Sequence, residues 1–323
     1  MPAPSTPATA SLPGVPLRDP EAALPFVSVI IPHLNDHDRL ERCLRELRRQ
    51  TYPSHRFEII VVDNGSRIPV EPIVARHPGV VAAAETERGC GTARNRGVGI
   101  SRGDVLAFTD ADCLPDPTWL ARGVAMLMRD DAPDIVGGEI EIFAANETAP
   151  TDAELYEKVF GFQQAVYVRK KHFAAGANIL TTRAAFQRLG PFRNGKVPED
   201  LEWGQRAKAK GLRVAYCEKA VVRHPARRTW TELCWKMDRT VFHNHNFMRE
   251  RPHFHARWMF LIALLCVPPV DKLWEVAASP RLRGTSEKWR VARTVLRLRY
   301  YRIGRMLRCL TDHEALGRGH FSP

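Results

Sequence analysis

Short β-branched runs alternate with segments of helical periodicity, and this alternation limits the possible folds more than any other feature of the sequence. Four apolar runs suit buried strands: residues 26–31, 57–62, 80–84 and 105–109. Three segments between or after them have helical spacing of apolar residues: 38–50, 93–100 and 119–128. Strands joined through helices by short links predict an α/β fold, with a mostly parallel central sheet flanked by helices.

The pattern becomes less regular beyond residue 135. In order, we expect a strand at 135–143, a helix at 153–168, a small-residue segment leading to a strand at 174–180, a helix at 199–210 and one or two strands at 212–222. Residues 1–24 are rich in Pro, Ala, Ser and Thr and lack the basic start and apolar run of a signal peptide. They are therefore predicted to form a disordered leader.

Cysteine usage and the apolar segments bear on the compartment. The chain has seven cysteines, an odd number, and no C-x-x-C pair. This pattern argues against a disulfide framework or a zinc site and favours a reducing, cytoplasmic location. The most apolar window, residues 258–270, is shorter than the roughly 20 residues that span a bilayer. It suits a buried helix or one that lies at a membrane interface.

Polar residues follow three of the predicted strands, at the edge of the sheet where ligands bind in such folds. They are Asn35-Asp36, Asp63-Asn64-Gly65-Ser66 and Asp110-Ala111-Asp112. Two carboxylates two residues apart suit a hard divalent cation, which completes its shell with water and phosphate oxygens. Aspartate also stabilises turns, so the pair by itself leaves both interpretations open.

An ordered set of short motifs includes these segments. Its members are Pro32-His-Leu-Asn35, Val62-Asp-Asn-Gly-Ser66, Gly91-Thr-Ala-Arg-Asn-Arg-Gly97, Asp110-Ala-Asp112, Gly176-Ala-Asn178, Leu189-Gly-Pro-Phe192, Glu199-Asp200 and Arg223-His224. In order and spacing the set resembles the family 2 glycosyltransferases over roughly residues 26–230. The resemblance implies a GT-A fold, with a nucleotide-diphospho-sugar-binding catalytic domain at 25–230 and a basic helical C-terminal extension at 231–323.

The resemblance further implies an inverting glycosyltransferase that depends on Mg²⁺ or Mn²⁺. Processive members of the family carry a Gln-x-x-Arg-Trp motif and several transmembrane helices. In this sequence Gln205-Arg206 is followed by Ala, and we find no apolar run long enough for a span. Transfer of single sugars is therefore expected rather than polymer extrusion.

Residue roles at the donor follow from the same resemblance. Pro32 and Asn35 are expected to line the nucleotide pocket, and Asp63 to accept a hydrogen bond from the base. Arg94 is expected to approach the nucleotide or its phosphates, and Asp110 to contact the ribose and the metal shell. Judged from the residues alone, Asp63 also suits a turn and Arg94 also suits the surface of a helix.

The resemblance also assigns metal ligands and a base. Asp112 is implied as the direct metal ligand, with His224 as a third ligand, and Asp200 as the catalytic base that takes the proton of the acceptor hydroxyl. Glu199 is expected to position the acceptor. Without the resemblance, His224 suits an ordinary strand end, and the two acids suit a helix N-terminus. Residues 193–197, a polar loop before the base, are expected to close over the donor.

Positive charge is concentrated in the sequence that follows the predicted catalytic domain. From residue 251 to the C-terminus, 14 Lys and Arg stand against 5 Asp and Glu, which accounts for nine of the twelve net positive charges. Arginines there alternate with apolar residues at helical spacing: Val291, Val295, Leu298, Met306 and Leu310. We expect this helix to lie on an anionic membrane, such as the inner face of the plasma membrane. The alternative is that it packs against the catalytic domain.

The expected partners are a nucleotide-sugar donor, most commonly a UDP-sugar in this family, and a saccharide or lipid-linked saccharide acceptor in polysaccharide, cell-envelope or glycolipid synthesis. Two other classes of protein fit the sequence less well. A nucleotidyltransferase of similar fold would carry a Gly-rich basic loop after the first strand, where this chain has Pro32 to Asp36. A nucleic-acid-binding protein is disfavoured because the charge is confined to the tail, so no nucleic acid is expected. Histidines 243, 245, 253 and 255 lack Cys or acidic partners and suit a polar helix and turn better than a metal site.

Overall fold

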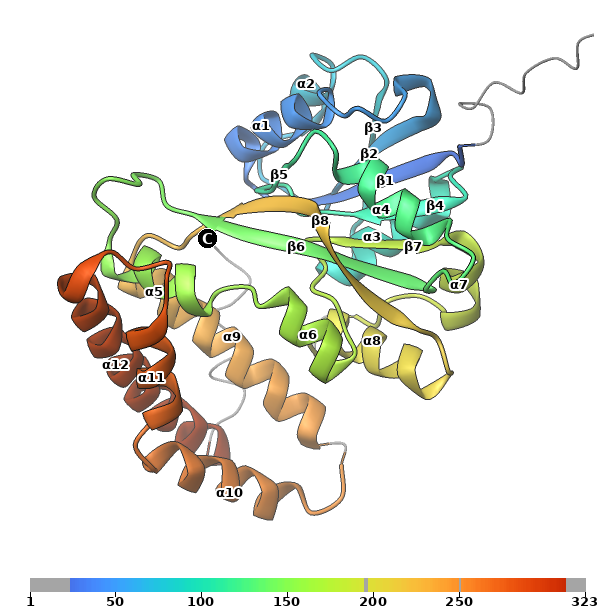
Figure 1. Ribbon diagram of the computed structural model, residues 1–323. Coiled ribbons are helices and arrows are strands. Elements are labelled where there is room, and N and C mark those ends of the chain that lie inside the picture. The colour runs from blue at the N-terminus through green and yellow to red at the C-terminus, as the bar shows by residue number, and fades with distance from the viewer. Residues whose placement is uncertain (1–23, 195–196, 250, 312–323) are drawn as a thin grey trace, which may run out of the picture.

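The computed structural model describes residues 24–194, 197–249 and 251–311, so the predicted leader and the middle of the predicted closing loop lie outside the described residues. One mixed sheet occupies the upper part of the molecule, and four C-terminal helices extend away from it (Figure 1). The strands are β1 (Val27–His33), β2 (Phe57–Asp63), β3 (Val80–Ala84), β4 (Val105–Phe108), β5 (Leu114–Pro115), β6 (Ile135–Phe143), β7 (Ile179–Thr182) and β8 (Val214–Pro225).

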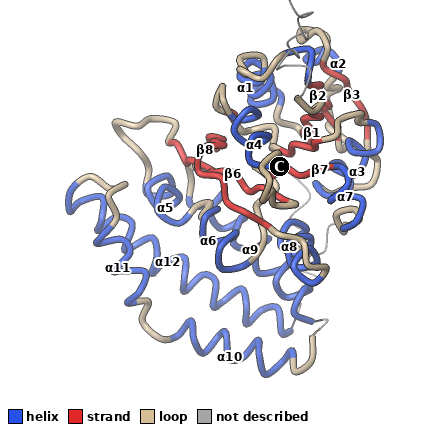
Figure 2. Tube along the Cα trace, turned by 45° about the vertical axis from the view of Figure 1, so that its right-hand side comes forward, coloured by secondary structure: helices blue, strands red, loops and turns tan. Residues whose placement is uncertain are grey.

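The helices flank this sheet and form the C-terminal layer (Figure 2). They are α1 (His37–Leu47), α2 (Glu71–Val74), α3 (Cys90–Ile100), α4 (Trp119–Leu127), α5 (Asp152–Phe160), α6 (Gln164–Lys171), α7 (Arg183–Leu189), α8 (Glu199–Ala209), α9 (Trp230–Arg249), α10 (Phe254–Cys266), α11 (Val270–Ala278) and α12 (Gly284–Thr311). A single 3₁₀ turn, Ser54–Arg56, precedes β2.

The eight strands lie in the order β3-β2-β1-β4-β7-β6-β8-β5. The first four are parallel, and Val27 of β1 pairs with both Phe57 and Val105, so the carboxyl ends of β1, β2 and β4 lie close together at one edge. Strand β7 is antiparallel to both β4 and β6, whereas β8 is parallel to β6. The expected α/β fold is confirmed, and its parallel pairing is concentrated in the N-terminal half.

The alternation of side chains along β1 divides the core between the two faces of the sheet. Val29 and Ile31 pack in one cluster with Leu44 of α1 and Leu120 of α4. Ile30 packs on the other face in a cluster with aromatic side chains of α7 and α8. Because β1 is buried on both faces, its sequence is a nearly continuous apolar run.

One predicted element differs from the structure, and another takes one of its two expected forms. The helix expected at 153–168 is two helices, α5 and α6, which are separated at residues 161–163. Gly161 ends α5, and a Cβ at this position would lie 2.4 Å from the carbonyl oxygen of Glu157. The segment expected to hold one or two strands at 212–222 is the single strand β8, with an irregular register opposite Gly138/Glu139.

The apolar stripe of α12 is covered by protein. Val291 and Val295 pack in one cluster with residues of α5 and α11, while Met306 packs against Trp258 of α10. Arg290 and Arg293 both pair with one carboxylate of α5, that of Asp152. Four members of the stripe that the sequence predicted for a membrane are therefore buried within the protein, as the alternative interpretation predicted, whereas the fifth, Leu310, is 40% exposed. No helix in the described part of the chain is long and apolar enough to cross a bilayer.

A buried ionic cluster joins α5 to the start of the C-terminal helices. Glu157 is 1% exposed and pairs with Lys236 of α9 at 2.6 Å and with Arg227 at 3.0 Å. Burial by itself would raise the pKa of Glu157, but the two cations outweigh it and lower the pKa to about 2. The carboxylate is therefore ionised at neutral pH and holds both cations.

Candidate active site

The end of β2 carries the first group of predicted site residues. Asp63 is the last residue of the strand, and both its oxygens accept a hydrogen bond from the backbone N–H of Ser66. The Ser66 hydroxyl also donates to Asp63 at 2.5 Å and accepts from the backbone N–H of Asn35. The Asn35 amide oxygen in turn accepts from the backbone N–H of Arg67. The structure thus joins the loops after β1 and β2 around the Asp63 carboxylate.

His33 completes this group and was not among the predicted site residues. Its Nε2 accepts from the backbone N–H of Asp36, so the proton resides on Nδ1, which lies 3.4 Å from Asp63 Oδ1. Burial lowers the pKa of His33 and favours the neutral ring. The sequence could have indicated His33 by its position near the end of a buried strand, next to the expected site.

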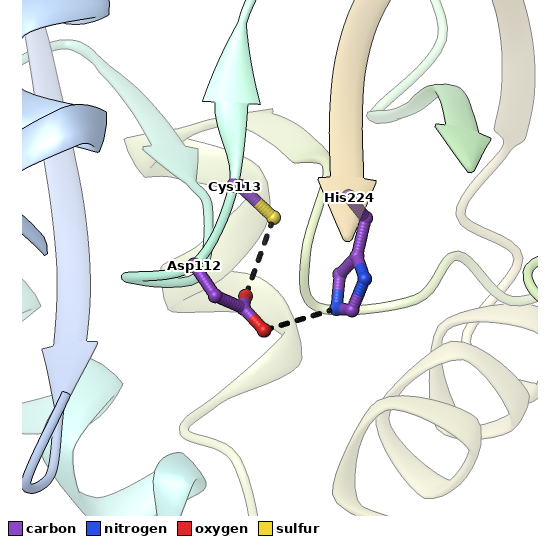
Figure 3. A group of neighbouring side chains, drawn as sticks. All are labelled: Asp112, Cys113 and His224. Atoms are coloured by element: carbon purple, nitrogen blue, oxygen red, sulfur yellow. Dashed lines mark hydrogen bonds and ion pairs between the residues drawn. The ribbon is translucent and has the colours of Figure 1, made fainter. Parts of the chain in front are cut away.

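Asp112 lies where the loop after β4 approaches the end of β8. Its Oδ2 is 3.4 Å from Nε2 of His224, and the Cys113 thiol donates to its other oxygen (Figure 3). Within the described residues, these three side chains are the one group of His, Cys and acidic residues close enough to share a metal ion. Two of the three predicted metal ligands therefore come together from segments that are more than 100 positions apart.

The hydrogen bonding of His224 suits a metal ligand. Nδ1 lies 2.7 Å from the carbonyl oxygen of Pro225, and because a carbonyl only accepts, the proton resides on Nδ1. In the neutral tautomer this leaves the lone pair of Nε2 directed toward the Asp112 carboxylate. Such an arrangement of two acceptors, with the imidazole fixed from behind, fits a bound cation.

The carboxyl group of Asp112 and the thiol of Cys113 differ in how burial affects them as donors to a metal. Burial, followed by the negative charge of Asp110, raises the pKa of Asp112, while His224 lowers it. Burial also raises the pKa of the Cys113 thiol far above its ordinary value, so the sulfur stays protonated. The carboxylate and imidazole donors are compatible with a divalent metal ion, whereas a protonated thiol contributes little as a ligand.

The side chain of Arg94 is buried and does not lie on a helix surface. The guanidinium is 3% exposed, pairs with Asp110 at 2.8 Å and with Glu199 at 3.2 Å, and so joins the loop after β4 to the start of α8. A Cβ on Gly176 would lie 2.4 Å from Nη2 of Arg94, so only glycine allows the backbone to approach this closely. Arg94 therefore has two carboxylate partners in this structure.

Asp200 stands at the N-terminus of α8, next to Glu199. Its Oδ1 accepts from its neighbour's backbone N–H, that of Leu201, at 2.8 Å, and Oδ2 accepts from the backbone N–H of Gly176 at 3.4 Å. Burial and then the negative charge of Glu199 raise the pKa of Asp200 to about 6. This carboxyl group combines a fixed orientation with an unusually high proton affinity.

The remaining predicted residue, Pro32, lies in β1 opposite Val62 of β2, one position before the His33–Asp63 pair. Asp36 contacts Arg39 at 3.1 Å on the outside of the same loop. The structure therefore forms two groups, one around Asp63 and one around Asp112 and His224. The Arg94–Asp110 pair links the loop of the second group to the start of α8.

Comparisons with known proteins agree with this arrangement. Residues 28–190 match the family model described as glycosyl transferase family 2. The glycosyltransferase AglE of Haloferax volcanii is 33% identical over 212 residues, which cover 64% of this chain and 69% of that protein. The probable glycosyltransferase YdaM of Bacillus subtilis is 27% identical over 231 residues, covering 68% of this chain and 55% of the relative.

A solved structure shares the fold over most of the chain. It is a mannosyltransferase from Pyrobaculum calidifontis in complex with GDP-Man and Mn²⁺, with a TM-score of 0.62 at 20% identity, covering 90% of this chain and 88% of that one. This likeness supports the GT-A fold. Together with the family match and the 33% identical relative, it shows that the chain belongs to glycosyltransferase family 2 and is a glycosyltransferase of the GT-A fold.

Proposed function

We propose that this enzyme transfers a single sugar, with inversion, from a nucleotide-diphospho-sugar to an acceptor hydroxyl, and that the transfer requires Mg²⁺ or Mn²⁺. The observation that carries the proposal is the pairing of Asp112 Oδ2 with Nε2 of His224. Asp63 at the end of β2 and Asp200 at the start of α8 supply the other groups that such a reaction needs, and Arg94 connects the loop of Asp110 to Glu199, the neighbour of Asp200.

The donor is expected to bind along the ends of β1, β2 and β4. Asp63 keeps lone pairs beyond those used by Ser66, and these accept from an N–H group of the base. A UDP-sugar remains the first expectation and a GDP- or dTDP-sugar the alternative. The mannosyltransferase described above holds GDP-Man, and a GalNAc-transferase structure with TM-score 0.51 and 21% identity holds UDP, GalNAc and Mn²⁺.

Asp112 and His224 are proposed as the metal ligands, with Asp110 at the ribose and the metal shell. A divalent cation held there would neutralise the charge of the departing diphosphate. Arg94 is still proposed to approach the nucleotide or its phosphates, and its guanidinium is also engaged by two carboxylates. We assign to it the positioning of Asp110 and Glu199 relative to each other.

Asp200 is proposed as the base that accepts the proton of the acceptor hydroxyl while that oxygen attacks the anomeric carbon. A carboxyl group whose pKa is about 6 remains roughly nine-tenths ionised at pH 7, and it is a stronger base than an ordinary Asp. Displacement on the face opposite the leaving group inverts the anomeric configuration. Residues 25–230 would carry this reaction, and 231–323 would form the extension that supports it.

The acceptor is proposed to be a saccharide or a lipid-linked saccharide in polysaccharide, cell-envelope or glycolipid synthesis. A panel of nucleotide sugars, assayed for release of the nucleoside diphosphate with Mn²⁺ and with EDTA, tests the proposal. We expect one nucleotide class to give metal-dependent release that Asp112→Ala abolishes. Asp116→Ala serves as a matched control, because Asp116 bonds to the nearby Thr118 rather than to the site. Metal-dependent formation of a nucleotide sugar from a sugar phosphate would instead identify a nucleotidyltransferase.

A further inference from the structure

The C-terminal helices carry most of the large hydrophobic side chains that the described residues expose. Eleven of the fifteen such side chains lie between residues 259 and 310. They are Met259, Phe260, Leu264, Val267, Val270, Trp274, Trp289, Leu296, Tyr300, Leu307 and Leu310. Scattered exposed apolar residues are normal on a protein surface, but a concentration of this kind marks an interaction site. We call these residues the exposed apolar face.

Helical periodicity shows that the face consists of stripes rather than scattered positions. In α10, Phe260 and Leu264 recur at an interval of four, on the side opposite the buried Trp258 and Ile262, and the exposed Val267 directly follows the helix. Each stripe therefore belongs to the outside of its helix, while the inside is used for packing.

The long helix α12 repeats this arrangement. Trp289, Leu296, Tyr300 and Leu307 recur at intervals of seven, four and seven, on the side opposite the buried stripe of Val291. The amphipathic helix expected from the sequence thus has a second apolar stripe, which the protein does not cover.

Direct contacts join the three helices into one layer. The Arg299 guanidinium of α12 donates to the carbonyl oxygens of Leu264, Leu265 and Val267 at the end of α10. Lys288 at the start of α12 donates to the carbonyl oxygen of Ala277 in α11. Both views place this layer at the end of the molecule opposite β3, away from the edge of the sheet that carries Asp63 (Figures 1 and 2).

The layer is also strongly basic. Arg257 borders the stripe of α10 and Arg308 that of α12, and neither has an ion pair within the described residues. The region from residue 251 onward carries nine of the twelve net positive charges of the chain. A surface that combines Trp and Tyr with aliphatic side chains and free arginines matches the chemistry of a bilayer interface with anionic headgroups.

We propose that the exposed apolar face docks on an anionic lipid bilayer, with Trp274 and Trp289 entering the interface and Arg257 and Arg308 contacting headgroups. This corrects the expectation from the sequence, because the docking face comprises α10, α11 and the outer stripe of α12, and not the stripe that contains Val291. A second copy of the chain is a poorer occupant, since pairing two such faces would bring two strongly positive surfaces together. The sequence outside the described residues has few large apolar side chains with which to cover the face.

Vesicle co-sedimentation of the full-length protein tests this proposal without any sugar donor, so its outcome is independent of the proposed function. The vesicles contain phosphatidylcholine alone or with phosphatidylglycerol, at low and at high salt. Wild type is expected to bind the anionic vesicles at low salt and to bind weakly to the neutral ones. Trp274→Glu with Trp289→Glu should lower the partition coefficient at least tenfold. The control Met128→Glu, at a half-exposed position at the end of α4, should leave it unchanged.

A second variant keeps the test informative if the tryptophan substitutions affect folding. Arg257→Gln with Arg308→Gln should weaken binding to anionic vesicles roughly 30-fold, because each arginine near such a surface contributes about 1 kcal/mol. Thermal unfolding of each variant shows whether it remains folded. The proposal is overturned if wild type does not sediment with anionic vesicles at low salt, or if folded variants bind as tightly as wild type. A stable dimer that the tryptophan substitutions dissociate would also overturn it, by identifying a second copy as the occupant.

Discussion

Replacing Glu199 with Gln changes the ionisation of Asp200 and leaves the shape of the site nearly intact. Burial and the adjacent Glu199 carboxylate raise the pKa of Asp200 from 3.8 to about 6, a shift of roughly 3 kcal/mol in proton affinity. The substitution removes the second cause and leaves the first, so the pKa should fall by about one unit and stay above that of an exposed Asp. The Arg94 guanidinium, released from Glu199, would lower it further.

The reaction requires the ionised form of Asp200, so the turnover number should fall as the pH drops through this pKa. At pH 5, a pKa of about 6 leaves roughly one-tenth of the base ionised, whereas a pKa near 5 leaves about half. Glu199→Gln should therefore retain about five times more of its own plateau rate at pH 5 than wild type does. Its plateau near pH 8 need not equal that of wild type, because Glu199 also holds Arg94.

Initial rates of sugar transfer from pH 4.5 to 8.5, at saturating donor, acceptor and Mn²⁺, give this profile. Asp200→Asn is the reference, and should bind donor normally with a loss of turnover of at least 10². The reasoning fails if the acidic limb of Glu199→Gln coincides with that of wild type, or if Asp200→Asn retains full turnover.

Three further predictions concern the metal site, the C-terminal helices and the glycine beneath the base. His224→Ala should abolish the extra thermal stabilisation that Mn²⁺ gives to the nucleotide complex, without abolishing folding; an unchanged shift would exclude His224 as a ligand. In chemical denaturation, Glu157→Gln should cost about 3 kcal/mol, because it removes the charge of a buried carboxylate that pairs with two part-exposed cations, whereas Asp152→Asn in a more exposed pair should cost under about 1 kcal/mol. The stabilisation by the Glu157 carboxylate is fully present above pH 4.5 and is lost as the pH falls toward its folded pKa of about 2. The free energy of unfolding of Glu157→Gln should therefore converge with that of wild type in acid. Gly176→Ala should displace the Arg94 guanidinium and lower turnover more than donor affinity, and equal losses of both would contradict the positioning role.

The elements that the sequence predicted well are those whose signal is local. Strands β1 and β2 are buried on both faces, so their β-branched runs identify them with few alternatives. The motif residues Asn35, Asp63 and Asp112 lie at or beyond the carboxyl ends of β1, β2 and β4, and the parallel pairing brings these strand ends to one edge. The antiparallel insertion of β7 between β4 and β6 has no comparable signal, because strand neighbours are chosen by tertiary packing.

The features that the sequence left open or missed depend on distant partners. Arg94 and a surface arginine look alike in sequence, and only the fold brings Asp110 and Glu199 to its two sides. Likewise, the periodicity of α12 predicts an apolar stripe but not what covers it, and α5 and α11 supply that cover. His33 was missed because a neutral buried histidine in a strand resembles any core residue until its contact with Asp63 is seen.

The anomeric configuration of the transferred sugar tests the central claim most directly. Proton NMR of the product formed from the preferred nucleotide sugar and acceptor shows the configuration of the new glycosidic bond, which does not mutarotate. We predict a new glycosidic bond of configuration opposite to that of the donor, formed with Mn²⁺ and not in excess EDTA. A product that retains the donor configuration would contradict a single displacement with Asp200 as the base, and transfer at full rate in EDTA would contradict the metal site at Asp112 and His224.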